Sequence, residues 1–439
     1  MTDTGSFDAQ SASAGCPAQA GAVRMTGLEY QKMPSQVYRD LRRAHGSVAP
    51  VLLDGDIPAW LVLGYPEVAY VTGHEELFAR DSRRWNQWEN IPPDWLLMPF
   101  VRYQPSVMFA EGDEHRRRAA AITEALEGVD QIQLGRDCQL IAHQLIASFA
   151  GGGQAELMDG YAHALAMRVV VQMCGMPASS TDTRQLVNDL RITLDIAHGD
   201  DPVAAIGRVA ARLWQLVKDK RANPGPDITS RLVTHPAGLT DEEVVHDLIA
   251  VIAGAEQPTA IWICNTLLLL LTDERFAVNV SGGRLSVGEA LNEVLWLDTP
   301  VQNFLGRWAV QDTQLGGQHI RAGDCLVLGL AAANTDPQIW PDAHVGAENS
   351  SHLSFGNGEH RCPYPAPLLA DVIARTAVET LLERLPDLVL AVEPAELSWR
   401  HSVWIRGLTA LPVHFTPLAQ QPSSSRPAAQ SPPSQAMVG

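Results

Sequence analysis

The fold is decided by the stretch His352-Leu-Ser-Phe-Gly-Asn-Gly-Glu-His-Arg-Cys362-Pro-Tyr-Pro-Ala-Pro-Leu-Leu369. Gly356 and Gly358 allow a tight turn to approach a flat group without Cβ clashes, and the prolines after Cys362 preset the first turn of a helix. The apolar residues that follow recur with helical spacing. The free N–H groups at the start of a helix favour a thiolate, the form of cysteine that binds a metal. Cys362 is therefore predicted to be an iron ligand.

The same stretch resembles the haem-binding signature of the cytochromes P450, FGxGx(H/R)xCxG. The residues that occupy the family positions are Phe355, Gly356, Gly358, His360 and Cys362. Only the final glycine differs, because this chain has Tyr364 there. A buried cysteine in a glycine-rich turn is the alternative interpretation. The resemblance implies a mainly α-helical fold with small β-sheets (α+β), and a haem b whose iron is bound by the Cys362 thiolate.

The composition predicts one large haem domain between residues 24 and 416, because no linker-like stretch interrupts them. Residues 1–23 and 417–439 have low-complexity compositions without apolar periodicity, so both are predicted to be disordered tails. The N-terminus lacks the features of a signal peptide or membrane anchor, and the six cysteines form no CxxC pair. The formal net charge of −18 disfavours nucleic acid and anionic membranes as partners. A soluble, cytoplasmic protein without a membrane span is expected.

The N-terminal part resembles the small sheet region of the family. A short helix is predicted at Met33–Ala44, a strand at Ala59–Gly64 and a flanking segment at Val68–Thr72. The irregular segment Trp85–Phe100 is unusually aromatic for a loop. In the family this position is a lid over the substrate. The simpler interpretation is that these side chains hold an irregular loop against the body of the protein.

A helix is predicted to begin near Glu111, with acidic residues in its first turn and cations after it. It resembles the family helix in which a histidine, and an arginine four residues later, bind the haem propionates. His115 has the histidine position, but Ala119 stands at the arginine position. Arg117 or Arg118 could substitute, although a run of arginines more often forms a solvated face. Such a basic patch beside the cysteine face could instead dock an acidic electron donor.

Residues 130–222 are predicted to form successive amphipathic helices, with a turn at Asn223. Thr240 and Glu243 then form a capping box that begins a mostly apolar helix ending near Thr272. Charged residues leave no uncharged run of the roughly 18 residues that a membrane span needs. A buried central helix is expected instead, similar to the family helix that crosses the haem.

The match to that central helix lies at Ala253-Gly-Ala-Glu-Gln-Pro-Thr259, against the family pattern AGx(D/E)T(T/S). The resemblance implies that Ala253 and Gly254 contact the haem. It also implies a catalytic pair that delivers the protons consumed in oxygen activation. Glu256 supplies the acid of this pair, but Gln257 stands where the family has a threonine.

Gln257 can form hydrogen bonds through its amide but has no rotating hydroxyl, so proton delivery would need water or another group. Pro258 removes a backbone hydrogen bond and is expected to kink the helix and make room for such water. Thr259 offers a hydroxyl at a displaced position. The alternative is that Glu256 is only a capped polar residue at a kink.

Ala290–Trp296 resembles the ExxR helix of the family, but Trp296 occupies the arginine position. The arginine expected in a later meander is also missing at Trp340–His344. Trp296 can fill the volume and donate one N–H, whereas Glu293 loses its cationic partner and is expected to accept backbone hydrogen bonds. The chain looks like an atypical actinobacterial subset with ExxW and a CPYP run.

A buried haem carries two carboxylates that need cationic or hydrogen-bonding partners. The residues in the family positions for such partners are His115, Arg307, His352 and His360. Residues Thr299–Leu305 are expected to line the pocket wall. The segment Arg400–Pro412 resembles the final hairpin, whose tip reaches the pocket.

Together these resemblances imply a soluble bacterial cytochrome P450 monooxygenase of secondary metabolism. It would take electrons from a ferredoxin and its reductase and oxidise a small, largely apolar molecule. The alternative is a haem-thiolate protein without monooxygenase activity that serves as a sensor or interaction partner. Ala119, Gln257 and Trp296 motivate that alternative.

Overall fold

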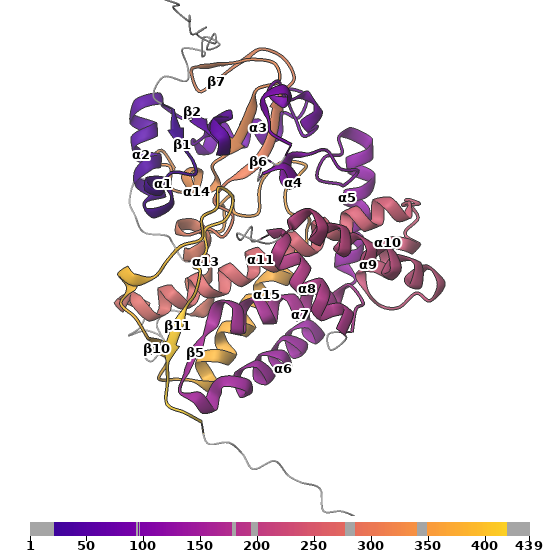
Figure 1. The fold of residues 1–439 in the computed structure, drawn as a ribbon, viewed down its shortest axis with the longest axis vertical. Coiled ribbons are helices and arrows are strands. Elements are labelled where there is room, and N and C mark those ends of the chain that lie inside the picture. The colour runs from indigo at the N-terminus through magenta and orange to yellow at the C-terminus, as the bar shows by residue number, and fades with distance from the viewer. Residues whose placement is uncertain are drawn as a thin grey trace, which may run out of the picture.

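Helix α11 (Asp241–Thr272) crosses the middle of the fold in this computed structural model (Figure 1). The structure describes residues 22–93, 95, 97–177, 181–194, 201–276, 286–339 and 349–418. The tails predicted at residues 1–23 and 417–439 lie outside these ranges except at their inner ends. There, strand β1 (Val23–Arg24) already begins at Val23, one residue before the predicted domain boundary.

Helices dominate the described chain, and the predicted mainly α-helical α+β class is confirmed. Besides α11 the helices are α1 (Leu28–Lys32), α2 (Pro34–His45), α3 (Tyr65–Gly73), α4 (Met98–Val101), α5 (Gly112–Glu127), α6 (Gln131–Phe149), α7 (Ala164–Met173), α8 (Thr181–Leu194), α9 (Pro202–Ala222), α10 (Ile228–Thr234), α13 (Val287–Leu297), α14 (Leu330–Asn334) and α15 (Ala366–Arg384). A π-helical turn, η6 (Met158–His163), precedes α7.

The strands form three small sheets. The largest has the order β1-β2-β3-β9-β6-β4, and its further strands are β2 (Val48–Leu52), β3 (Pro58–Val62), β9 (Cys325–Leu328), β6 (Phe304–Ala309) and β4 (Phe78–Ala79). The second sheet contains β10 (Val389–Leu390), β11 (Pro412–His414) and β5 (Gln154–Glu156), and the third is the hairpin of β7 (Thr313–Leu315) and β8 (Gln318–Ile320).

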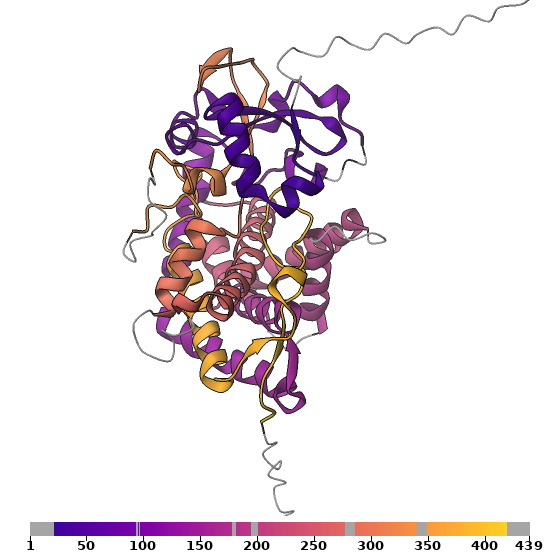
Figure 2. The same cartoon turned by 90° about the vertical axis from the view of Figure 1, so that its left-hand side faces the viewer.

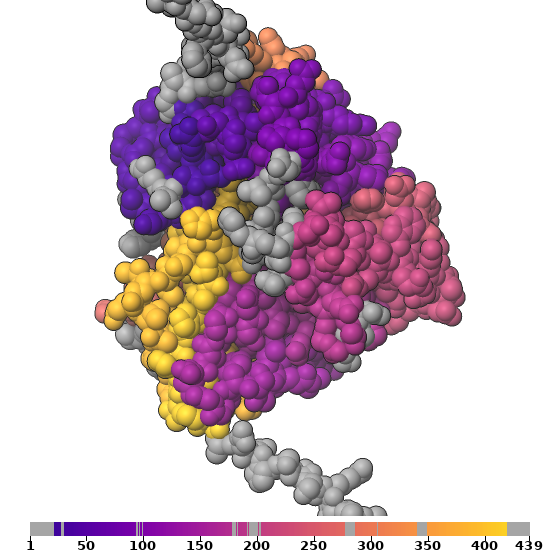
Figure 3. Space-filling view, viewed as in Figure 1, coloured from indigo at the N-terminus to yellow at the C-terminus, as the bar shows by residue number. Residues whose placement is uncertain are grey.

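The large sheet and the first helices form one layer of the molecule, and the long helices form another (Figures 1 and 2). In the space-filling view the indigo N-terminal part lies against the yellow C-terminal segment (Figure 3). The segment Val68–Thr72, predicted to flank a strand, lies inside helix α3. Its buried residues Val68, Val71 and Thr72 have helical rather than alternating spacing, which explains the difference.

Helix α11 begins where its capping residues predict. The Thr240 side chain accepts a hydrogen bond from the Glu243 backbone, and the Glu243 carboxylate accepts one from the Thr240 N–H at 2.8 Å. The helix continues through Pro258 to Thr272. It is long and apolar enough to cross a membrane, but 61% of its most apolar 18-residue window is buried inside the fold. It is therefore the core helix of this fold.

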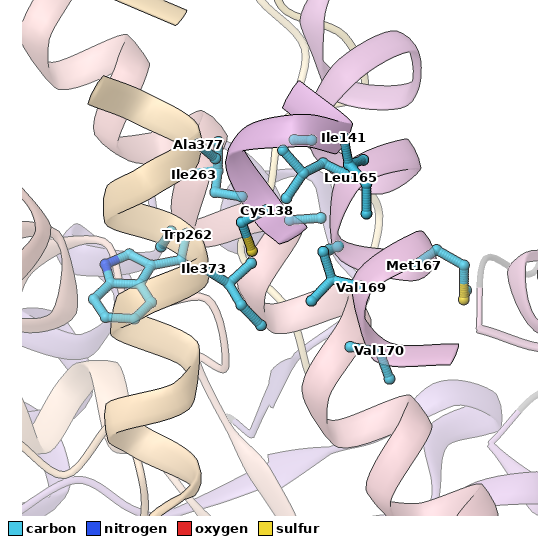
Figure 4. Close-up of a cluster of buried hydrophobic side chains, with 14 of the residues drawn as sticks. Cys138, Ile141, Leu165, Met167, Val169, Val170, Trp262, Ile263, Ile373 and Ala377 are labelled. Atoms are coloured by element: carbon cyan, nitrogen blue, oxygen red, sulfur yellow. The ribbon is translucent and has the colours of Figure 1, made fainter. Parts of the chain in front are cut away.

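The helical core fixes the two elements that carry the site. Helix α11 packs against α7, α9, α13 and α15, and α15 also packs on α6. Figure 4 shows side chains from these helices, among them Cys138, Ile263 and Ile373, and all three are buried. Burial of such a side chain contributes about 1.5–3 kcal/mol. The packing holds the start of α15, just after Cys362, at a set position relative to α11.

The aromatic segment near residue 90 is anchored to the large sheet. The ring centroid of Trp85 lies 5.7 Å from that of Trp95 and 6.3 Å from that of Trp308 on β6. The indole N–H of Trp95 donates to the carbonyl of Asp54 at 2.9 Å. These contacts hold the segment against the body of the protein, and Trp95 also lines the cavity described below. Both interpretations of this segment thus have structural support.

Candidate active site

A cavity of about 1450 Å³ lies between α11 and the loop that contains Cys362. The loop residues that line it include Phe355, Gly356, His360 and Cys362. The Cys362 N–H donates to the Phe355 carbonyl at 2.8 Å, which closes the turn. Gly358 has a φ of 76°, and a Cβ there would lie 2.0 Å from the Thr72 carbonyl oxygen. The turn therefore requires glycine at position 358, as its spacing suggested.

Burial raises the pKa of the Cys362 thiol to about 11. The start of α15 at Ala366 is therefore not sufficient by itself to produce a thiolate at neutral pH. A metal ion that binds sulfur displaces the proton, so binding and deprotonation are coupled. Cys362 lies just before a helix, as the sequence predicts, and its thiolate form with a bound metal stays a prediction.

One face of α11 lines the cavity and another faces away from it. Ala253, Gly254 and Gln257 line the cavity, as do Pro258 and Thr259. The stripe Ile252, Glu256 and Ala260, with the helical spacing i, i+4 and i+8, is buried but contributes nothing to the cavity wall among the described residues. The structure thus brings Gln257 to the site and turns Glu256 away from it.

Glu256 belongs to a polar cluster on the far side of α11. Its carboxylate lies 2.6 Å from Nδ1 of His163, on the π-helical turn η6. Nε2 of His163 lies 3.3 Å from Nη2 of Arg400, and the Arg400 guanidinium lies 3.8 Å from the exposed carboxylate of Asp159. Glu256 lies off the cavity face that Gln257 lines, because one residue along a helix rotates the side chain by about 100°, and its catalytic role stays a prediction.

His115 and His360 face the cavity as a stacked pair with ring centroids 3.8 Å apart. Nδ1 of His360 lies 2.5 Å from the Glu75 carboxylate, and its Nε2 lies 2.9 Å from the Ala110 carbonyl. Burial, with a contribution from His360, lowers the pKa of His115 to about 4. His115 is therefore neutral at pH 7 and can offer a hydrogen bond but not a positive charge.

Arg307 on β6 also lines the cavity and is only 2% exposed. Its Nη1 donates to the Gly306 carbonyl at 3.3 Å, while its buried Nε has no hydrogen-bond partner in the described part of the chain. Burial lowers the pKa of Arg307 to about 10, so the guanidinium stays charged at neutral pH. A buried charge of this kind needs an anion, as the sequence analysis anticipated.

Sequence reasoning missed a second buried cation at the same edge. Arg80 directly follows β4, is 3% exposed and lines the cavity. Its Nε donates to the Met108 carbonyl at 2.8 Å. Nothing in the local sequence marks Arg80, because its neighbour Arg307 is more than two hundred residues away and only the pairing of β4 with β6 brings them together.

His352 is not brought to the cavity, since it is absent from the described residues of the cavity wall. It packs edge-to-face against Trp296, with ring centroids 5.8 Å apart. Trp296 is 1% exposed and donates its indole N–H to the Asn349 carbonyl at 2.8 Å. The large indole is buried and packs against His352, in line with the packing role predicted for it. The propionate role expected for His352 stays a prediction, and its buried Nδ1 has no hydrogen-bond partner in the described part of the chain.

Glu293 has a cationic partner after all. Its carboxylate accepts a hydrogen bond from Nη2 of Arg275 at 2.7 Å, and Arg275 also pairs with Asp273. The expectation that Glu293 loses its cationic partner and accepts backbone hydrogen bonds instead was wrong, because Arg275, beyond the end of α11, pairs with it. The segment Trp340–His344, where the sequence lacks a further family arginine, lies outside the described residues.

The three arginines of α5 do not form a solvated face. Arg118 is fully buried, and its guanidinium binds both carboxylate oxygens of Asp247 at 2.6 and 3.0 Å. Arg117 pairs with Glu243. Arg116 alone is largely exposed. Arg117 and Arg118 therefore link α5 to α11, and the only α5 cation left on the described cavity wall is the exposed Arg116, beside the uncharged Ala119.

The cavity fits haem in three respects. A thiol stands at the start of a helix, Phe355 and α11 supply apolar walls, and buried guanidinium groups lie at one edge, where two carboxylates need partners. Most of the remaining wall is apolar, with contributions from Trp95, Met98, Phe100, Val170, Ile249, Val301, Phe304 and Trp404. The predicted pocket wall at Thr299–Leu305 contributes Pro300, Val301, Asn303 and Phe304.

Comparison with known proteins gives the same class. The family model "Cytochrome P450" matches residues 287–363. Cytochrome P450 GfsF of Streptomyces halstedii is 30% identical over 370 residues, 82% of this chain and 87% of the relative. Cytochrome P450 monooxygenase PikC of Streptomyces venezuelae is 28% identical over 402 residues, 89% of this chain and 92% of the relative.

Among solved structures, myxobacterial cytochrome P450 CYP267B1 in complex with myristic acid has a TM-score of 0.76 at 25% identity. The match covers 89% of this chain and 98% of that one. The fold, the cysteine loop and these relatives define the class as haem-thiolate oxidoreductases. The chain belongs to the cytochrome P450 family, and its cofactor is haem.

Proposed function

We propose that this P450 oxidises a small, largely apolar molecule with electrons from a ferredoxin and its reductase, in the cytoplasm. The observation that carries the proposal is the continuous cavity that joins Cys362 to the mostly apolar wall beyond α11. Residues 24–416 would form the haem domain. The relatives include a monooxygenase by name and a structure with bound myristic acid, which supports an apolar substrate.

The residues that would hold the haem divide by chemistry. Cys362 would bind the iron through its sulfur, and Phe355, Gly356, Ala253 and Gly254 would contact the two faces of the ring. His115, His360 and Arg307 would serve the carboxylate edge. When bound, the haem supplies oxygen activation, which a thiolate ligand favours.

Gln257 and Glu256 would have different parts in proton delivery. The Gln257 side chain faces the cavity, where its amide can hold and orient a water molecule. Thr259 also lines the cavity and is buried, so its hydroxyl is a second donor. Glu256 is hydrogen-bonded to His163 outside the cavity, so it would act as a proton store behind the helix.

The test begins with the difference spectrum of the reduced, carbon-monoxide-bound protein. The native chain should give the red-shifted Soret band of thiolate-bound haem, and Cys362→Ser should lose it. Substrate screening by spin-state change and by product yield with a ferredoxin and reductase then tests the reaction. A native band with neither spin shift nor product across a broad screen would favour the sensor or interaction role. A native protein without the band contradicts thiolate ligation itself.

A further inference from the structure

Two buried guanidinium groups lie next to each other at one edge of the cavity. Strand β4 pairs antiparallel with β6, with Phe78 opposite Ala309 and Ala79 opposite Trp308. Extended by one residue, this register places Arg80 opposite Arg307. Directly opposed residues of an antiparallel pair project from the same face, so both side chains point to the cavity that they line.

Such a pair is unfavourable unless an anion joins it. Like charges opposite each other destabilise a sheet, and burial of each charge adds a desolvation cost. Arg80 and Arg307 are 3% and 2% exposed, so solvent does not screen them. Glu75 and Glu111 lie close enough to Arg307 to raise its pKa, but neither forms an ion pair with it within 4 Å in the described part of the chain, and its Nε lacks a hydrogen-bond partner there. The Arg307 guanidinium is therefore left without a directly bound anion among the described residues.

Arg80 is held in a fixed orientation toward this edge. Its Nε donates to the Met108 carbonyl at 2.8 Å and its Nη1 to the Gly306 carbonyl at 2.5 Å. Gly306 lies at a register shift of β6 with a φ of 107°, and a Cβ there would lie 2.5 Å from Nη1 of Arg80. The rings of Phe109 and Phe304 lie 5.8 and 5.1 Å from the guanidinium carbon.

Helix α5 supplies no buried cation to this edge of the cavity among the described residues, whereas the large sheet supplies two. Ala119 lines the cavity without a charge, and Arg117 and Arg118 are bound to carboxylates of α11. His115 is neutral, so α5 contributes no buried positive charge to the cavity wall among the described residues.

We propose that Arg80 binds a carboxylate of the haem together with Arg307, and so replaces the cation that α5 lacks at Ala119. The inference rests on the haem cofactor but not on the reaction that the haem carries out. Arg80 is thus a cofactor-binding residue contributed by the sheet, and the guanidinium pair is arranged before the cofactor arrives.

The experiment compares haem release from the purified holoprotein to excess apomyoglobin. Arg80→Gln should release haem about ten- to a hundredfold faster, the equivalent of one charge-assisted hydrogen bond, and Arg307→Gln should behave alike. The matched control is Arg83→Gln, whose side chain is 63% exposed and pairs with Asp81. It should stay within twofold of the native rate.

A second measurement separates charge from packing. The reduction potential of the haem should fall in Arg80→Gln and return toward the native value in Arg80→Lys, because lysine restores the charge but not the two carbonyl contacts. A structural role alone predicts that lysine is no better than glutamine in both measurements. Native haem release in Arg80→Gln, with fast release in Arg307→Gln, would overturn the proposal. The carbon-monoxide spectrum of the native protein tests the cofactor separately.

Discussion

The stretch that leads to Cys362 and helix α13 meet where His352 packs on Trp296, and they keep the family pattern to different degrees. The loop keeps every signature residue except the last glycine, and its turn depends on glycine at position 358. Helix α13 has lost the arginine of its motif, yet Glu293 is still paired with a guanidinium, that of Arg275.

The difference separates two kinds of constraint. Residues that would contact the cofactor must fit the shape and charge of a fixed molecule, so the loop tolerates few substitutions. Residues that only support the loop need a filled volume and a balanced charge, and other parts of the chain can supply both. Trp296 supplies the volume, and Arg275 supplies the charge.

The largest predicted effect concerns the loop. Gly358→Ala should abolish haem binding, because the new Cβ would lie 2.0 Å from the Thr72 carbonyl oxygen at a φ of 76°. Overpacking and a left-handed conformation together cost about 3 kcal/mol or more. Haem content after purification measures the loss. Gly207→Ala in helix α9, where no atom lies within 4 Å of the added Cβ, is the matched control and should bind haem normally. Normal haem content in Gly358→Ala would show that the loop does not require glycine at position 358.

Restoring the family arginine should harm this protein. Trp296→Arg would place a charge at a position that is 1% exposed, while Glu293 is already paired. An uncompensated buried charge costs about 3–5 kcal/mol. The thermal midpoint of the holoprotein should fall accordingly, and much less in Trp296→Phe, which loses only part of the ring and one hydrogen bond. Equal or greater stability of Trp296→Arg would mean that Arg275 does not fill the role assigned to it.

A smaller effect is expected in the catalytic wall of α11. Gln257→Thr introduces a hydroxyl on the cavity face, and the fraction of electrons lost to peroxide should fall about two- to tenfold, the worth of one hydrogen bond. Coupled turnover of any substrate found by spin shift measures this. Gln257→Val is the control, because valine has the shape of threonine without its hydroxyl, and it should not improve coupling. Unchanged peroxide leakage in both variants would remove position 257 from proton delivery.

The smallest effect belongs to the replacement ion pair. Arg275 is 52% exposed, so its pairs with Glu293 and Asp273 are screened by solvent. Arg275→Gln should therefore destabilise the protein by no more than about 1 kcal/mol, and salt should reduce the difference. Chemical denaturation of the holoprotein at low and high salt checks this. A loss of several kcal/mol in the free energy of unfolding would show that the Arg275 ion pair is essential to the stability of the fold.

Much of this architecture could be predicted from local sequence. The Cys362 loop, the capping box at Thr240 and the α+β class follow from spacing and composition within short windows. Even the position of Glu256 was available, since Ile252, Glu256 and Ala260 form a helical stripe distinct from that of Ala253 and Gln257. The family pattern, which pairs residues 256 and 257 by function, concealed their different faces.

The errors involve partners that are distant in sequence or have no motif. Arg80 meets Arg307 only through the register of β4 and β6, and Arg275 reaches Glu293 from another helix end. His352 also lies at a family position, and it packs against the Trp296 indole that stands where the family has an arginine. Such contacts depend on several positions together, so no single-position comparison could predict them.

The contact between Arg400 and His163 has a consequence for the hydrogen bond that Glu256 receives. A guanidinium has only donors, so Nε2 of His163 must accept its hydrogen bond, and the ring proton must be on Nδ1. His163 is then a neutral imidazole that donates to the Glu256 carboxylate rather than an imidazolium paired with it. Arg400 thereby selects the tautomer of a ring that it touches on one side, and so directs the N–H on the other side of that ring toward Glu256.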